Sequence, residues 1–199
     1  MLVPTLYYIR HGLTNWNAAG RLQGQLDIPL NARGRLDAVR SGEILRDLLV
    51  RAGRDAESVD YVSSPLVRAS ETMGLVRKTL GLEADGYDVD ARLAELSFGT
   101  WEGLTYDDVL ARDPEVVARR ERGKWTFQPP GGESYVQLAA RVGAWYATVT
   151  RDTVVTAHGG TGRALVALTG VAPPEEAAHH SIEQGVVYVF AEAGLWRHT

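Results

Sequence analysis

The chain contains 199 residues, with 21 Lys and Arg residues against 25 Asp and Glu residues, and it has no cysteine. This composition is typical of one globular domain, and the lack of cysteine excludes disulfides, thiolate metal sites and a cysteine nucleophile. The net charge of −4 argues against a nucleic-acid-binding protein, which needs a basic face. No secretory signal or membrane-length apolar run is visible, so we expect a cytoplasmic protein that does not bind membranes.

Strands and helices alternate along the sequence. The strand-like runs are rich in β-branched or aromatic residues and cover 6–9, 60–62, 153–156 and 186–190. Apolar residues at helical spacing predict helices over about 34–49, from a cap at 64–65 to Gly81, and over about 133–149. Because this alternation requires crossover connections, we expect a three-layer α/β/α sandwich with a mostly parallel central sheet. The apolar residues over 112–132 follow neither a helical nor a strand-like spacing clearly, and we expect a helical excursion and a loop there.

Polar residues suited to anion binding follow three of the predicted strands. Arg10 and His11 follow the first strand, Arg68 comes shortly after the second, and His158 and Gly159 follow the strand at 153–156. Ligands of parallel sheets bind beyond the carboxyl ends of the strands, so we expect these side chains to converge. Two guanidinium groups and two imidazole rings form a pocket suited to phosphate or carboxylate oxygens.

A histidine in such a pocket can also be a nucleophile. His11 could attack phosphorus if its ring were neutral, and neighbouring arginines lower the pKa of an imidazole. A histidine after a strand is also a common structural residue that only makes hydrogen bonds. These residues by themselves leave both interpretations open.

Five blocks of the sequence occur in an order that matches one known family. They are 8–17 (YIRHGLTNWN), 63–72 (SSPLVRASET), 93–103 (LAELSFGTWEG), 130–134 (PGGES) and 157–160 (AHGG). Together they resemble the histidine phosphatase superfamily, the phosphoglycerate-mutase-like group, over nearly the whole chain. The resemblance implies that His11 is the nucleophile that forms a phosphohistidine, while Arg10, Arg68 and His158 hold the phosphoryl oxygens. It implies neither a metal nor another cofactor, because arginines stabilise the transferring group.

Glu95 matches the general acid of this family, which protonates the leaving oxygen and then activates water. This role requires a carboxyl that is protonated near neutral pH. The alternative is a surface carboxylate that pairs with Arg92 or another base. Glu102, in the same block, is expected to be structural.

Other positions match family residues at the edge of the phosphate site. By resemblance, Asn17 and Gln23 contact the phosphate or its leaving group, and Thr14 and the backbone of Gly159 are weaker candidates. The alternative for Asn17 and Gln23 is loop hydrogen bonding, which is common for these residue types. Leu13 departs from the family, where Glu or Gln is more usual, and this departure concerns only contacts at the rim.

Two further features are not interpreted as ligand sites. His179 and His180 are adjacent, and adjacent side chains on a helix point in different directions, so we expect surface residues and no metal site. The run Gly159-Gly160-Thr161-Gly162-Arg163 lacks the Lys-Ser/Thr ending of a phosphate-binding P-loop.

The resemblance also implies that residues 1–199 form a single histidine phosphatase domain with a small cap insertion over about 104–132. This cap contains a basic run that is usually a solvated helix face but could contact a second anionic group of a substrate. The run consists of Arg119, Arg120, Arg122 and Lys124.

The favoured function is a metal-independent phosphomonoesterase that acts on a small phosphate ester. Alternatives are a cofactor-dependent phosphoglycerate mutase, a non-catalytic phosphate-binding module, and a small phosphatase of phosphohistidine proteins. Mutases of the family carry a longer insertion, whereas 62 residues separate Glu95 from His158 here, which favours the phosphatase. A homodimer is an open option, because dimers are common among relatives.

Overall fold

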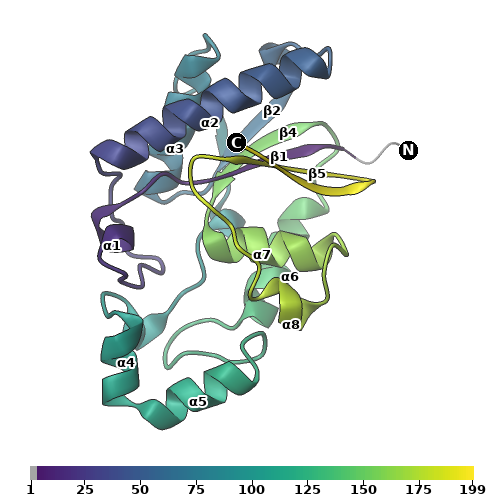
Figure 1. The fold of residues 1–199 in the computed structure, drawn as a ribbon. Coiled ribbons are helices and arrows are strands. Elements are labelled where there is room, and N and C mark those ends of the chain that lie inside the picture. Colours follow the sequence, from purple (N-terminus) through teal and green to yellow (C-terminus); the bar gives the residue numbers. More distant parts are fainter. Residues whose placement is uncertain (1–3) are drawn as a thin grey trace.

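The computed structural model describes residues 4–199, and within them one mixed sheet of six strands runs through the protein (Figure 1). The strand order is β3-β2-β4-β1-β5-β6. The strands are β1 (Leu6–Arg10), β2 (Asp60–Ser63), β3 (Asp88–Val89), β4 (Thr153–Ala157), β5 (Val187–Ala191) and β6 (Gly194–His198). Strands β1 to β4 pair in parallel, whereas β5 is antiparallel to both β1 and β6.

Helices cover both faces of this sheet (Figure 1). One face carries α2 (Ala32–Arg51) and α3 (Val67–Thr79). The other carries α6 (Tyr135–Tyr146), α7 (Gly159–Leu168) and α8 (Pro174–Ala177). The predicted three-layer α/β/α sandwich with a mostly parallel sheet is therefore confirmed.

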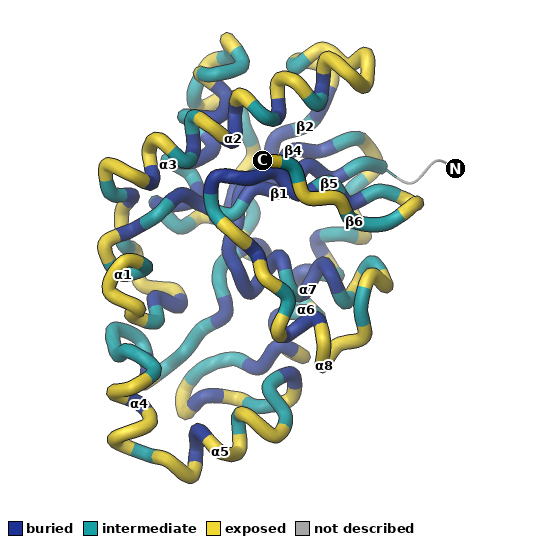
Figure 2. The backbone as a smooth tube through the Cα atoms, viewed as in Figure 1, coloured by how far each residue is buried: buried dark blue, intermediate teal, exposed yellow. Residues whose placement is uncertain are grey.

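The two cores lie on opposite faces of the central strands. Tyr7 and Ile9 pack with α2 and α3, whereas Leu6 and Tyr8 pack with α6 and α7. This alternation follows from the two-residue period of a strand. All five residues of β4 are buried, as expected for a parallel strand that is covered on both sides, and Figure 2 shows this central region as the most buried part of the backbone.

A separate small core lies under the segment between residues 98 and 127. Helices α4 (Tyr106–Arg112) and α5 (Pro114–Arg122) lie away from the sheet (Figure 1) and enclose Trp101, Val109, Val116 and Val117. Helix α5 is the expected helical excursion. Helix α4 was not predicted; it begins at a capping box in which Thr105 and Asp108 bond each other's backbone.

Several element boundaries differ from the predictions. Helix α3 begins at Val67 instead of directly after Ser64, and α6 ends at Tyr146 instead of about 149. His179 and His180 follow α8 instead of lying on a helix. The short helix α1 (Asn15–Ala18) and the 3-10 helices η1 (Ala56–Ser58), η2 (Ala91–Leu93) and η3 (Gly99–Trp101) complete the elements.

Across residues 4–199, no helix is both long enough and apolar enough to span a bilayer. The first three residues, on which the expectation about a secretory signal partly depends, lie outside the described residues.

Candidate active site

The candidate site lies at the carboxyl ends of β1, β2 and β4. His11 follows β1 and His158 follows β4; both rings are buried, and their centroids are 5.2 Å apart. A cavity of about 150 Å³ beside them is lined by Arg10, Arg68 and Glu95, among others. The structure thus brings together the five residues to which the family resemblance assigns catalysis.

The contacts of His11 define which ring nitrogen is free. Its Nδ1 lies 2.8 Å from the carbonyl oxygen of Gly12, and because a carbonyl only accepts hydrogen bonds, Nδ1 carries the ring proton. Burial lowers the pKa of His11 well below 6.5, and the charges of Arg10 and Arg68 lower the pKa further. The ring is therefore neutral at pH 7, with the lone pair of Nε2 available for nucleophilic attack.

Close backbone packing fixes the loop that carries His11. A Cβ at Gly12 would lie 2.0 Å from the carbonyl oxygen of Gly34 in α2, and a Cβ at Gly34 would lie 2.1 Å from that of Leu13. The Gly12 N–H also donates to Thr72 Oγ1 of α3 at 3.1 Å. Only glycine permits this approach, so α2 and α3 both hold the nucleophile in place.

The two arginines present unpartnered N–H groups. Arg68 is fully buried and donates to the carbonyls of Gly24 and Leu26 at 2.7 and 2.8 Å, while Arg10 donates to another carbonyl at 2.7 Å. Within the described chain, Nε of both arginines and Nδ1 of His158 are buried without a hydrogen-bond partner. An unsatisfied buried donor costs roughly 1–3 kcal/mol, so the two guanidinium N–H groups indicate a site for an oxyanion.

Ser64 holds the ring of His158. Its Oγ lies 2.7 Å from His158 Nε2 and accepts the N–H of Leu66 at 3.3 Å. If the hydroxyl donates its own proton to Nε2, the ring proton of His158 lies on Nδ1, the atom without a partner. Burial, together with the charge of Arg68, lowers the pKa of His158 well below 6.5, so this ring is also neutral.

Glu95 lies at the N-terminus of α7. Its Oε1 accepts the N–H of Gly160 at 3.0 Å and that of Leu96 at 2.8 Å. A Cβ at Gly160 would lie 2.2 Å from the same oxygen, so glycine is needed for the carboxylate to reach this position. Arg92 pairs with Asp90 at 2.6 Å, so the alternative pairing of Glu95 with Arg92 is wrong.

The backbone around Glu95 is held by Arg141 of α6. Its guanidinium donates to the carbonyls of Arg92, Ala94 and Glu95 at 2.7 to 2.9 Å and pairs with Glu133 at 2.8 Å. Glu133 belongs to the PGGES block, so this block helps to position the candidate acid Glu95 indirectly, through Arg141. Glu102 accepts backbone N–H groups of nearby loops, which is the structural role that we expected.

The predicted rim residues take two different positions. Asn17, Gln23 and Gly159 line the cavity, whereas Thr14 is fully buried and does not line it. The hydroxyl of Thr14 lies 3.0 Å from both Asn17 Oδ1 and Gln23 Oε1, and it caps α1. Thr14 therefore supports the two amide side chains from behind.

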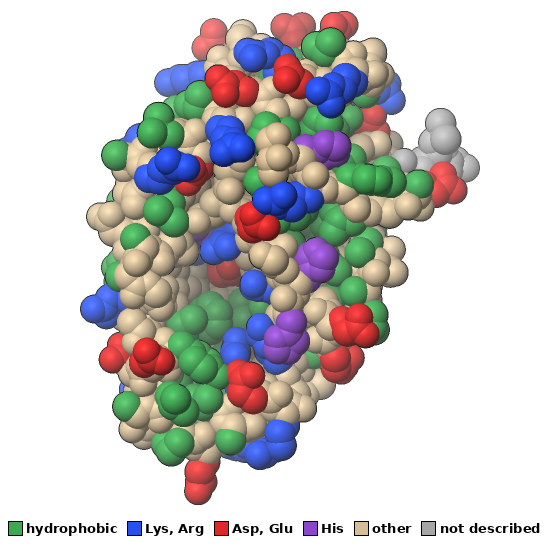
Figure 3. All heavy atoms as spheres, in the orientation of Figure 1, with side chains coloured by type: hydrophobic (Ala, Val, Ile, Leu, Met, Phe, Trp, Pro, Cys, Tyr) green, Lys and Arg blue, Asp and Glu red, His purple; other side chains and the backbone are tan. Residues whose placement is uncertain are grey.

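The sequence analysis gave no site role to five residues that line the cavity, namely Arg21, Leu22, Gly24, Phe98 and Arg163. A signal existed for Arg163, which comes four residues after Gly159 and therefore lies on the same face of α7. Figure 3 shows the surface hollow between the sheet and the α4–α5 region, with Lys and Arg side chains along one wall and hydrophobic side chains opposite.

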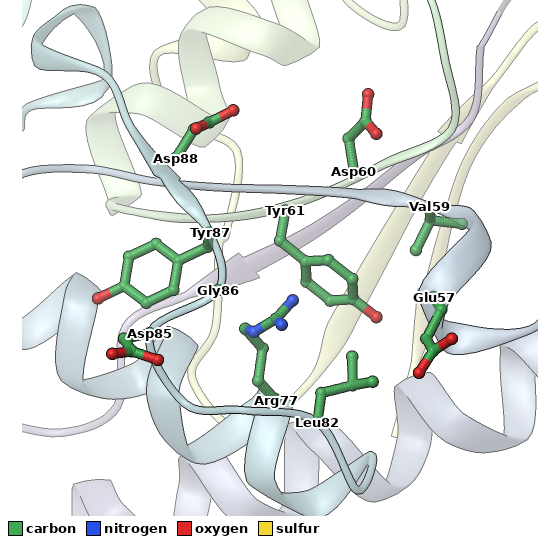
Figure 4. Close-up of a pocket in the computed structure, with 10 residues that line it drawn as sticks. All are labelled: Glu57, Val59, Asp60, Tyr61, Arg77, Leu82, Asp85, Gly86, Tyr87 and Asp88. Carbon is green, nitrogen blue, oxygen red and sulfur yellow. The ribbon is translucent and has the colours of Figure 1, made fainter.

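A second cavity, of about 530 Å³, lies beside β2 and β3 (Figure 4). There the guanidinium of Arg77 lies 4.5 Å from the centre of the Tyr61 ring. Its other lining residues include four carboxylates and no histidine; the acidic residues are Glu57, Asp60, Asp85 and Asp88. This cavity shares no residue with the histidine site and lacks the nucleophile and anion-binding groups found there.

Comparison with known proteins agrees with the geometry of the histidine site. The glucosyl-3-phosphoglycerate phosphatase of Mycobacterium tuberculosis is 36% identical over 184 residues, which cover 84% of this chain and 75% of that protein. The 2,3-bisphosphoglycerate-dependent phosphoglycerate mutase of Afipia carboxidovorans is 30% identical over 192 residues, which cover 93% and 90%. The solved structure of a mycobacterial glucosyl-3-phosphoglycerate phosphatase has a TM-score of 0.78 at 30% identity, covering 94% of this chain and 89% of that one.

The family model of the histidine phosphatase superfamily (branch 1) matches residues 6–194, nearly the whole chain. This match confirms the resemblance found in the five sequence blocks. The chain therefore belongs to the histidine phosphatase superfamily.

Proposed function

We propose that this chain hydrolyses a small phosphorylated metabolite by transferring its phosphoryl group first to His11 and then to water. The observation that carries the proposal is the neutral, buried His11, whose Nε2 is free while unpartnered N–H groups of Arg10 and Arg68 are buried in the same site. Membership of a phosphatase superfamily, with relatives named as phosphatases, supports the same class of reaction.

In the first step, Nε2 of His11 attacks phosphorus as the bond to the ester oxygen breaks. Arg10, Arg68 and His158 bind the non-bridging oxygens, whose charge is spread in the transition state. Glu95 supplies the proton to the leaving oxygen, so an alcohol departs and a phosphohistidine remains.

In the second step, water attacks the phosphohistidine. Glu95, now a carboxylate, accepts a proton from the water, while the N–P bond breaks and returns the lone pair to Nε2. Inorganic phosphate leaves, and His11 and Glu95 regain their starting protonation states. The segment 104–132 then acts as a cap whose side chains contact the alcohol part of the ester.

A mutase is the second candidate, and one observation favours it. The Afipia carboxidovorans mutase aligns over 90% of its own length, so the expected longer insertion does not separate this relative from the present chain. In a mutase, the phosphoryl group on His11 returns to a substrate hydroxyl instead of passing to water.

The test is phosphate release from a panel of phosphorylated metabolites and p-nitrophenyl phosphate, with EDTA present. We expect EDTA-resistant release that is abolished in His11→Ala and unchanged in the matched control His179→Ala, which changes an exposed histidine. Release that survives in His11→Ala contradicts the proposed nucleophile. No release, combined with interconversion of 2- and 3-phosphoglycerate that depends on 2,3-bisphosphoglycerate, assigns the mutase instead. The cytoplasmic location and the homodimer stay predictions, and light scattering tests the latter.

A further inference from the structure

We infer that Gln184 is a positioning residue of the phosphoryl site, which orients the side-chain amide of Asn17 toward the bound anion. The inference rests on the proposed function and adds to it a residue from the C-terminal part of the chain. Gln184 lies three residues before β5, outside the five sequence blocks and outside the lining of the cavity. Its contacts therefore carry the argument, because neither a motif nor the cavity identifies it.

The side-chain amide of Gln184 joins two segments of the site. Its Nε2 donates to the backbone carbonyl of His11 at 3.1 Å and to Oδ1 of Asn17 at 3.2 Å. An amide nitrogen carries two protons, so both bonds form together. The backbone of Gln184 also forms an isolated parallel β-bridge with Arg10, the last residue of β1. Gln184 thus connects the segment that carries the nucleophile to Asn17.

These contacts determine which end of each amide points toward the cavity. The carbonyl of His11 only accepts, so the Gln184 atom that meets it is the amide nitrogen, and the Asn17 atom that meets this nitrogen is the oxygen. The N–H of Thr14 also donates to Asn17 Oδ1, at 3.1 Å. Asn17 lines the cavity, so with its oxygen turned toward Gln184 and Thr14 its two N–H donors are left for a ligand oxygen. The reverse orientation would place the amide oxygen against an anion.

The segment that carries Gln184 is anchored on its N-terminal side. The carbonyl of Ile182 accepts Nη1 of Arg10 at 2.7 Å. The N–H of Glu183 donates to the hydroxyl of Tyr188 at 2.8 Å, and Tyr188 is buried. The amide of Gln184 therefore extends from a fixed backbone, as is required of a residue that orients another side chain.

The test is a titration of the isotope-labelled protein with inorganic phosphate, followed by NMR. It gives the Kd for phosphate and the shifts of the Asn17 side-chain amide, which is assigned by its loss in Asn17→Ala. In the native protein we expect this amide to shift as phosphate binds. In Gln184→Met, which keeps the length of the side chain but has no donor, the Kd should rise roughly 3- to 10-fold, the size of one hydrogen bond.

Two comparisons separate positioning from stability. Gln137→Met removes the hydrogen bonds at 2.8 and 3.1 Å that an exposed glutamine forms with Ser134, away from the cavity lining, and should leave the Kd for phosphate unchanged. In an Asn17→Ala background, Gln184→Met should change the Kd less than about 2-fold, because no amide remains to be oriented. A role limited to folding would lower the melting temperature without changing the Kd of the folded protein.

Three outcomes overturn the inference. They are a native Asn17 amide that does not respond to phosphate, an unchanged Kd in folded Gln184→Met, and an equal rise in Kd with and without the Asn17 side chain. The first is read on the native protein, so it decides even if Gln184→Met does not fold.

Hydrolysis of p-nitrophenyl phosphate by the native protein tests the proposed function separately, because phosphate binding needs no turnover. A protein that releases no phosphate from the ester, yet binds phosphate more weakly in Gln184→Met, contradicts the proposed function and supports the positioning of Asn17 by Gln184.

Discussion

Replacing Gly160 with alanine tests how Glu95 is positioned. The new Cβ would lie 2.2 Å from Glu95 Oε1, whereas ordinary contacts begin at 3.4 Å, so the carboxylate oxygen must move by about 1.2 Å, the difference between these values. The added methyl group would also lie only 3.2 Å from Leu138 Cδ2, which is tighter than an ordinary contact. A shift of about 1 Å at a catalytic group can reduce the rate on the order of 100-fold.

The loss should depend on the leaving group. An alkyl phosphate needs a proton on its leaving oxygen, so we expect its kcat/KM to fall roughly 100-fold in Gly160→Ala. p-Nitrophenyl phosphate has a leaving group that departs without a proton, so its kcat/KM should fall far less. Gly74→Ala in α3 is the control, because its Cβ would meet only ordinary contacts at 3.5 and 3.9 Å.

A double-mutant comparison completes the test. In a Glu95→Ala background there is no carboxylate to displace, so Gly160→Ala should add little further loss for the alkyl phosphate. Equal losses for the two esters, or the full loss in the Glu95→Ala background, would refute the positioning of Glu95 by Gly160. Circular dichroism and thermal melting confirm that the variants are folded before the rates are compared.

Two more predictions concern the histidines. The folded pKa values of His11 and His158 are lowered, so below pH 6.5 the unfolded chain takes up protons that the folded chain does not. The free energy of unfolding should therefore fall as the pH drops from 6.5. The fall is up to about 1.4 kcal/mol per pH unit for each histidine, until the folded pKa is reached. Denaturant titrations at several pH values give the free energy of unfolding as a function of pH, and this pH dependence should be weaker in His11→Gln but not in His179→Ala. An unchanged pH dependence in His11→Gln contradicts a neutral buried His11. Ser64→Ala should lower kcat more than it changes KM and move the ring proton of His158 away from Nδ1, as read from imidazole nitrogen NMR shifts. Ser70→Ala, whose hydroxyl bonds only its own helix, is the control, and an unaltered His158 tautomer in Ser64→Ala removes Ser64 from this role.

The strands that position the site were predictable because their composition differs sharply from that of their surroundings. β1 and β4 are runs of aromatic or β-branched residues, and His11 and His158 directly follow them. That these two histidines lie close together could therefore be inferred from the predicted strands. Elements with little apolar surface gave no such signal. Helix α4 buries only Val109, and β3 has two residues, both exposed.

The position of Glu95 could not be predicted from local pattern. Its backbone is held by Arg141, 46 residues further along the chain, and its carboxylate by Gly160, 65 residues away. Contacts over such distances leave no periodic trace in one sequence, so family resemblance was the only guide to Glu95. The helix boundary at Ser64 was misplaced for a related reason, since its hydroxyl contacts His158 instead of capping a helix.

The separate core beneath α4 and α5 has a consequence for how relatives of this protein can differ. Trp101, Val109, Val116 and Val117 pack with one another and not with the two cores of the sheet, and Phe98 packs against both this small core and the one beneath α6 and α7. Side chains of α4 and α5 can therefore be exchanged at little cost to the stability of the sheet. Under the proposed function, in which this segment contacts the alcohol part of the ester, substrate choice could change during evolution independently of the phosphoryl chemistry, and Phe98, which also lines the cavity, lies at the junction.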